Sequence, residues 1–281
     1  MTIIKADVVA DSITENGDRL TTLQCVYPWF IHAEVMTHRK LSRNAASARA
    51  IPTSRMLKMV WENPAVPLVW GKNQSGMQAY TQVGPVRRVL AKSIWLTACV
   101  FAIGCTWLLS KLGLHKQIGN RLLSPFLHIH VVLSATNFDN LLALRDHPAA
   151  EPHFQILAGK ILEALNESTP KLLKKGEWHL PYVTEEERTG FVLVALIEFS
   201  VARCARVSYL NHDKSNPKPA NDRRLYHDLI VSRPAHASPA EHQATPGDKG
   251  VPSGNFEGWV QFRKTLDGEN VDHYAKLLRK G

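Results

Sequence analysis

The sequence predicts a mixed α/β protein, and three of its features carry this prediction. Residues 3–23 read as two strand-like pieces on either side of Asn16-Gly17-Asp18, a turn typical of β-hairpins. Residues 86–112 form a long helical region, and residues 191–201 form a second apolar helix. Apolar side chains make up 44% of the 281 residues, which is enough for a sizeable core.

The bulk composition indicates an anionic partner in a reducing compartment. The net charge is +9 and the isoelectric point is near 9.4, which suits an anionic ligand or a nucleic acid. Four cysteines, without any Cys-x-x-Cys pair, predict neither a disulfide scaffold nor a structural zinc site. The N-terminus shows no secretory signal, so we expect a cytoplasmic protein.

Residues 94–109 form an uncharged apolar run bracketed by Lys92 and Lys111. This run is shorter than the roughly 18 to 20 residues that a membrane-spanning helix needs. We therefore expect a buried central helix, with membrane insertion as the alternative.

The stretch from Thr37 to Arg49 reads Thr-His-Arg-Lys-Leu-Ser-Arg-Asn-Ala-Ala-Ser-Ala-Arg and contains no acidic residue. Guanidinium groups and hydroxyls at this spacing can bind phosphate oxygens, so the stretch predicts a site for a phosphorylated small molecule. If it is helical, His38, Ser42 and Arg49 share a face. The alternative is a solvated basic helix or a nucleic-acid-binding patch.

Further along the chain, residues 55–61 are expected to be helical and the prolines that follow end the helix. Residues 71–78 are too irregular for a phosphate-binding loop of the Walker type and are interpreted as a loop that could line the site. His128 and His130 would share one face of a strand. Without a third ligand nearby in the sequence, they are interpreted as structural, and no metal is assigned.

Phe138, Leu141, Leu142 and Arg145 recur at helical spacing, which places Arg145 on a face that packs against protein. A buried arginine needs an anion, either a ligand or a carboxylate such as Glu151 or Asp139. Residues 167–189 are polar and indicate a connector, whereas residues 214–220 and 245–254 are rich in Pro and Gly and indicate loops.

The basic stretch resembles the signature of the flavin-dependent thymidylate synthases, Arg-His-Arg-x-x-Ser-x-Asn-Glu-x-Ser-x-Arg-Tyr. Six residues stand in register with it, namely His38, Arg39, Ser42, Asn44, Ser47 and Arg49. Thr37, Ala45 and Ala50 stand where the family has arginine, glutamate and tyrosine. Glu34 stands where the family has a glutamine, so the differences gather on the side that would read the pyrimidine.

Other blocks resemble the same family. Arg121 with Pro125, and Asn140 to Arg145, are similar to its arginine-proline and Asn-x-x-x-Leu-Arg elements. Residues 202–210 and 236–242 resemble its Ala-Arg-Val-Ser-Tyr and His-x-Ser-Pro-x-Glu-His signatures, which in the family precede the arginine motif. Here they follow it, so we infer a circular permutation. Residues 258–264 resemble an Arg-Gln-Trp-x-Arg element or an amphipathic helix, and Gln261 or Arg263 could replace what Glu34 and Thr37 no longer offer.

The resemblance implies a central, largely antiparallel sheet flanked by helices, in one catalytic domain over residues 1–281. Its first part, residues 1–165, would hold the arginine motif and the Asn140–Arg145 helix, and its second part, residues 190–281, the rotated signatures. The family is tetrameric, with each site built from several subunits, so a homo-oligomer is expected.

The resemblance also implies the activity, in which FAD and NADPH support transfer of a one-carbon unit from methylenetetrahydrofolate to C5 of dUMP. Ser47 and Arg145 would be catalytic, with Arg145 stabilising charge on the pyrimidine carbonyl. The residues implied to bind the nucleotide are Glu34, Ser47, Arg49, Arg121 and Arg145. Those implied to bind FAD are His38, Arg39, Asn44, Asn140 and His242. Neither a stable nucleic-acid partner nor a membrane is expected.

Two alternatives stay open. Because Glu34, Thr37 and Ala45 alter the pyrimidine side, the enzyme could act on another nucleotide such as dCMP, or deliver a hydroxymethyl group, as would suit hypermodified viral DNA. The other alternative is a non-catalytic nucleic-acid-binding protein on the same fold, whose affinity for DNA would depend on salt.

Overall fold

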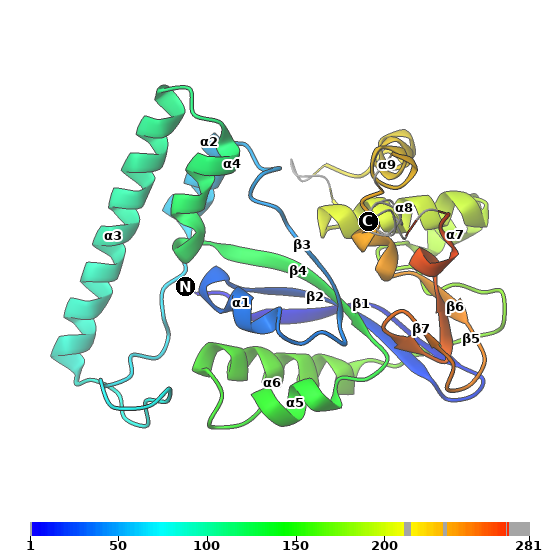
Figure 1. Cartoon of the computed structure of the whole chain (residues 1–281), viewed down its shortest axis with the longest axis horizontal. Coiled ribbons are helices and arrows are strands. Elements are labelled where there is room, and N and C mark those ends of the chain that lie inside the picture. The colour runs from blue at the N-terminus through cyan, green and yellow to red at the C-terminus, as the bar shows by residue number, and fades with distance from the viewer. Residues whose placement is uncertain (1, 211–214, 233–234, 268, 270–281) are drawn as a thin grey trace, which may run out of the picture.

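The computed structural model describes residues 2–210, 215–232, 235–267 and 269, and its centre is a five-stranded sheet (Figure 1). The strand order is β3-β4-β2-β1-β5, and every neighbouring pair is antiparallel except β1 with β5. The sheet is thus largely antiparallel, as predicted. Its strands are β1 (Lys5–Thr14), β2 (Arg19–Pro28), β3 (Ser42–Ala45), β4 (His128–Ala135) and β5 (Lys171–Leu173).

The N-terminal hairpin is confirmed. β1 and β2 pair antiparallel around a turn in which Gly17 has φ +89°, a conformation that costs glycine little. The Gly17 N–H donates to the Thr14 carbonyl at 3.0 Å, and the Asp18 N–H donates to Thr14 Oγ1 at 3.1 Å. The second strand runs further than residue 23 and ends at Pro28.

Strand β4 sends alternate side chains to the two faces of the sheet. Ile129, Val131 and Leu133 belong to the main core, together with residues of α5 (Asp139–Arg145) and α6 (Pro152–Glu167), which cover one face (Figure 1). By the same alternation, His128 and His130 share the opposite face; the sequence predicted that they share a face, but not which one.

The opposite face is covered in two places. Val132 packs there against residues that include Cys204 of α8 (Leu193–Arg206). Near the other end, a second cluster joins α2 (Thr53–Glu62), α3 (Pro85–Lys111) and η2 (Asn120–Phe126).

The remaining helices are η1 (Trp29–Ile31), α1 (His32–Val35), α4 (Lys116–Gly119), α7 (Glu185–Gly190), α9 (Pro219–Tyr226), η3 (His227–Val231), η4 (Ser238–Glu241) and η5 (Phe262–Thr265). Four short strands complete the described chain, namely β6 (Ala244–Pro246), β7 (Pro252–Ser253), β8 (Phe256–Glu257) and β9 (Trp259–Gln261).

A buried ion-pair network joins α7, α8 and α9. Arg203 of α8 has no exposed surface, and its guanidinium donates to Glu187 Oε1 at 2.5 Å and to Asp222 Oδ2 at 2.9 Å. Arg206 donates to the other Asp222 oxygen at 2.5 Å. Each charge in the network is therefore matched by an opposite charge, which a buried guanidinium requires.

The prediction that residues 94–109 form a buried helix is wrong. The segment is helical and lies within α3, but α3 runs along the flank of the molecule (Figure 1). Ile94 and Phe101 are 71% and 70% exposed, whereas on the inner side Cys99 and Thr106 are buried. By length and composition alone, α3 is long and apolar enough to cross a membrane. Of the residues in its most apolar 18-residue segment, 11% are buried.

Five further expectations change. The basic stretch is a turn followed by β3, so it does not place its residues on one helical face. Residues 258–264 form β9 and η5 instead of an amphipathic helix. The polar connector contains β5 and α7, and the loop over residues 245–254 contains β7 and the end of β6. The loop over residues 214–220 runs into α9, and its first residue lies outside the described residues.

Candidate functional site

A pocket of about 450 Å³ lies where the end of the basic stretch faces α4 and η2. It brings together three of the predicted nucleotide-binding residues, Ser47, Arg49 and Arg121. We call it the arginine pocket. Its lining residues are Trp29, His32, Ala45, Ala46, Ser47, Ala48, Arg49, Gln117, Arg121, Ser124 and Ile129.

The loop that carries Ser47 and Arg49 is fixed in place by a buried side chain. Asn120, 1% exposed, donates from Nδ2 to the carbonyls of Ala48 and Ile51 at 2.9 and 3.1 Å. Lys116 Nζ donates to the Ala50 carbonyl at 3.1 Å. These bonds join the loop to α4 and η2, so the arginines on both sides of the pocket are held by one local framework.

The two arginines of this pocket carry uncompensated charge. Within the described part of the chain, neither Arg49 nor Arg121 forms an ion pair with a carboxylate, and the pocket is lined by no acidic residue. Arg121 uses Nε to donate to the Gln117 carbonyl at 3.1 Å, which leaves its terminal nitrogens free to bind a ligand. Together with the Ser47 and Ser124 hydroxyls, this is the donor set that binds phosphate.

The arginine pocket is also lined by aromatic rings. Trp29 and His32 pack edge to face with ring centroids 5.7 Å apart, and His32 Nδ1 is hydrogen-bonded to the Tyr27 hydroxyl at 3.0 Å. Burial, with a contribution from the charge of Arg43, lowers the pKa of His32, so its ring is neutral at pH 7. The pocket therefore combines anion-binding donors with neutral aromatic rings. In the sequence, the aromatic rings of this lining belong to or follow the run Tyr27-Pro28-Trp29-Phe30, whereas nothing distinguishes Gln117 or Ser124.

Glu34 and Arg145 lie in a different pocket, of about 580 Å³, beside the loop over residues 71–78. Arg145 Nε donates to His38 Nε2 at 2.9 Å, and Arg145 Nη1 is 3.9 Å from Glu34 Oε2. Burial first, and then the positive charges of Arg145 and Arg43, lower the pKa of His38. Arg145 is half-buried as expected. Its carboxylate is Glu34, not Glu151 or Asp139.

The residues implied to bind FAD lie in different surroundings in this chain. Arg39 and Asn140 are exposed, and the Asn44 amide donates to the Cys204 and Ala205 carbonyls at 2.7 and 3.4 Å. His38 lies beside Arg145. His242 has no exposed surface, so its ring cannot touch a ligand without local movement.

His242 instead ends a buried chain of hydrogen bonds across the sheet, which the sequence did not reveal. Ser12 Oγ bonds His179 Nδ1 at 2.9 Å, and His179 Nε2 bonds Thr22 Oγ1 at 2.8 Å. Thr22 bonds Ser134 at 2.6 Å, and Ser134 bonds His242 Nδ1 at 2.8 Å. Burial lowers the pKa of each histidine to about 3, so both rings are neutral. The described residues contain no group of three side chains able to hold a metal ion.

The fold is mixed α/β, and the donor groups that line the arginine pocket are of the kind that binds a small anion. No family model and no curated protein matches its sequence. Among solved structures, the UMP/dUMP methylase PolB from Streptomyces cacaoi bound with 5-Br UMP is similar, with TM-score 0.49 and 16% identity over 59% of this chain and 90% of that one. The flavin-dependent thymidylate synthase ThyX from Helicobacter pylori complexed with FAD and dUMP has TM-score 0.36 and 18% identity over 52% and 67%. Both similarities leave more than two fifths of this chain uncovered.

Proposed function

We propose that this chain is a flavin-dependent enzyme of the thymidylate synthase type. It transfers a one-carbon unit from methylenetetrahydrofolate to C5 of dUMP with FAD and NADPH, and acts on the free nucleotide in the cytoplasm. The observation that carries the proposal is the arginine pocket. Its two arginines have no carboxylate partner among the described residues and stand, with Ser47, at positions that resemble the family's nucleotide-binding residues.

In this proposal the chain's own residues bind and polarise the nucleotide. Arg49 and Arg121 hold the phosphate as charge-assisted donors, and Ser47 adds a hydroxyl. Arg145 stabilises the charge that develops on the pyrimidine carbonyl, and Glu34 orients Arg145 from 3.9 Å. FAD, when bound, supplies the redox chemistry, and the protein supplies orientation and electrostatics.

The residues proposed for one site are divided between two pockets of one chain. We propose that a homo-oligomer brings these residues together. The resemblance implies that this oligomer is a tetramer. The exposed apolar face of α3 supports self-association, because monomeric soluble proteins rarely leave such a large apolar patch in water. The circular permutation inferred from the motif order belongs to the same proposal.

A second nucleotide is favoured by one specific residue. Glu34 stands in place of a glutamine and lies in the same pocket as Arg145. A carboxylate only accepts hydrogen bonds, so it would pair with the exocyclic amine of dCMP better than with the N–H of uracil's imide edge. Delivery of a hydroxymethyl group would be a variation of the same chemistry.

The test has two parts. The purified protein is incubated with excess FAD and desalted, and its visible spectrum is recorded. Release of tritium from C5 is then compared for [5-³H]dUMP and [5-³H]dCMP. We expect retained flavin and release from dUMP. Release from dCMP alone would support the second nucleotide. A protein that retains no flavin, releases no tritium and binds DNA in a salt-dependent manner would contradict the proposal and favour a nucleic-acid-binding protein.

A further inference from the structure

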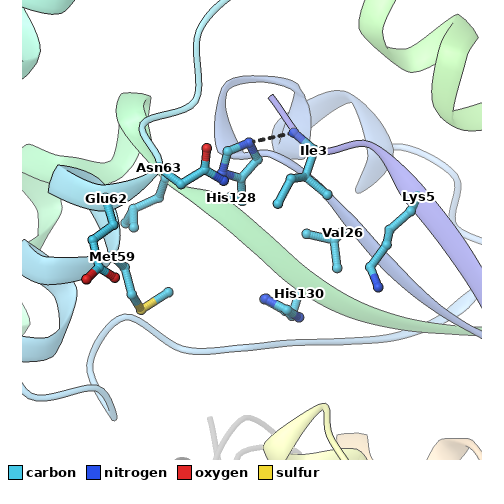
Figure 2. Close-up of a pocket in the computed structure, with 9 residues that line it drawn as sticks. Ile3, Lys5, Val26, Met59, Glu62, Asn63, His128 and His130 are labelled. Atoms are coloured by element: carbon cyan, nitrogen blue, oxygen red, sulfur yellow. Dashed lines mark hydrogen bonds between the residues drawn. The ribbon is translucent and has the colours of Figure 1, made fainter. Parts of the chain in front are cut away.

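A second pocket, of about 400 Å³, is lined by different residues from the arginine pocket and contains none of the residues predicted for the site. We call it the histidine pocket. Figure 2 shows Met59 and Glu62 on one side and Ile3 and Lys5 on the other, with His128 and His130 between them. Val26, Asn63 and Leu127 complete the lining.

The floor of the histidine pocket is a row of neighbouring residues across the sheet. Lys5 is paired with Val26, and Val26 is paired with His130. The row continues to Ala46, whose N–H donates to the His130 carbonyl at 2.9 Å. Ala46 lines the arginine pocket. With strands about 4.8 Å apart, Lys5 and Ala46 are separated by roughly 15 Å. A narrow cavity of about 30 Å³ between the two pockets shares His130 with one and Ala46 with the other.

The two histidines of this pocket differ in what they can offer to a ligand. His128 Nε2 accepts the Ile3 N–H at 2.9 Å (Figure 2). The His128 ring is also hydrogen-bonded to the Asn63 backbone. Burial lowers the pKa of His128 to about 4, and burial and the nearby Lys5 charge lower that of His130. Both rings are thus neutral at pH 7. The His130 ring has no hydrogen-bond partner among the described residues, so it can give one donor and one acceptor.

The walls of the pocket are apolar, and its polar groups lie along the floor and at the ends. Ile3, Val26, Met59 and Leu127 would contact the faces of a flat molecule, and Met59 is a thioether suited to aromatic rings. The His130 ring and Lys5 would meet the polar edge of that molecule. The volume falls within the range of pockets that hold a small organic ligand.

We propose that the histidine pocket binds the planar heteroaromatic ring of a second ligand, with His130 hydrogen-bonded to the ring's edge and the arginine pocket holding the nucleotide beside it. This inference rests on the proposed function, because transfer to a pyrimidine carbon requires a ring-bearing partner within contact of the nucleotide. A flavin and a folate share this chemistry, and the experiment separates them.

The experiment measures binding of riboflavin and of folic acid, each with and without dUMP. Riboflavin is followed by quenching of its fluorescence, folic acid by quenching of tryptophan fluorescence, and dUMP by calorimetry. Two variants act in opposite ways, since His130→Ala removes the polar edge and Met59→Trp fills the pocket. His147→Ala is the matched control, because His147 is exposed and lies outside both pockets. Circular dichroism and thermal unfolding confirm that each variant is folded.

We expect one of the two ring ligands to bind. Both variants should lower the affinity for that ligand about tenfold or more, because one removes a hydrogen bond and the other fills the site. The affinity for dUMP should change less than about twofold. If dUMP binds but the affinity of neither ring ligand responds to His130→Ala and Met59→Trp, the inference is overturned while the proposed function stands. If a ring ligand binds in this manner but dUMP does not bind, the inference stands and the proposed nucleotide site fails.

Discussion

At the scale of single residues, the arginine pocket is defined by charges without partners. Lys116, beside this pocket, donates to a backbone carbonyl, and in the other pocket Arg145 lies beside Glu34. Arg49 and Arg121 form no ion pair with a carboxylate in the described part of the chain. An unpaired guanidinium costs little while water solvates it, so these side chains are available to a phosphate.

Replacement of Arg49 or Arg121 by alanine should weaken dUMP binding by about 10- to 100-fold, because each hydrogen bond to a charged group contributes about 1.5–3 kcal/mol. Isothermal titration calorimetry measures the loss. Arg224→Ala is the matched control, since Arg224 is exposed on α9, far along the chain from this pocket. Equal affinities for Arg49→Ala, Arg121→Ala and the control would show that the phosphate binds elsewhere.

The buried histidines make a prediction about pH. Burial lowers the pKa of His179 and His242 in the folded protein to about 3, whereas the unfolded value is 6.5. The folded state therefore favours neutral rings. Their contribution to stability is complete above pH 6.5 and is lost as the pH falls toward 3. Between pH 7.5 and 5.5, each histidine should lower the free energy of unfolding by about 1.4 kcal/mol.

Urea unfolding at the two pH values tests this prediction in the wild type and in His242→Asn. Asparagine keeps a hydrogen-bonding group near the place of Nδ1 but does not titrate, so the variant should lose about 1.4 kcal/mol less than the wild type. The exposed His147 provides the control His147→Asn. A pH-dependent loss that is identical in all three proteins would exclude His242 as its source.

At the scale of elements, the sequence predicted where helices and strands lie along the chain better than it predicted what packs against them. The hairpin was predicted because Asn16-Gly17 has a defined turn chemistry, and α3 because its apolar run is long. The sequence could not show which side of α3 is buried, since apolar residues surround that helix and give no direction. It also could not show that the basic stretch becomes β3, because that strand exists through its pairing with β4, more than 80 residues away.

The exposed face of α3 predicts self-association. Lipid cannot surround this helix, because its inner side packs on Met56 and Val60 of α2 and on Leu123 and Phe126 of η2. Phe101→Lys and Leu108→Lys should convert an oligomer into a monomer of 31.5 kDa, measured by light scattering and sedimentation. Leu172→Lys is the control, since Leu172 and Leu108 are both 55% exposed but Leu172 lies on β5.

Cys105 provides an independent measurement of the same prediction. It is exposed on α3, whereas the other three cysteines are buried, so a maleimide reports on this helix alone. Labelling should slow as the protein concentration rises, and should stay fast in Phe101→Lys. A wild type that is monomeric at every concentration, or that binds lipid vesicles through α3, would show that something other than a second copy covers the helix.

At the scale of the whole molecule, the predicted site residues fall into two groups that one chain does not unite. Ser47, Arg49 and Arg121 line the arginine pocket, whereas Glu34 and Arg145 lie beside α5 and α6. The resemblance implied a single nucleotide-binding group of five residues, and the structure places three of them in one pocket and two in another. The spacing of residues along the sequence does not tell which copy of the chain supplies each residue to a site. The sequence alone therefore could not reveal this division.

Co-expression of Arg49→Ala with Arg145→Ala tests whether each site is shared between copies. If one copy supplies Arg49 and another supplies Arg145, random assembly leaves about a quarter of the sites with both arginines, so the mixture should recover about a quarter of the wild-type activity. Arg49→Ala with Arg121→Ala is the matched control, because both residues line the same pocket of one chain and no mixed site is intact. Recovery in neither mixture would mean that a single chain builds its own site, and Arg145 would then have to move to reach the nucleotide.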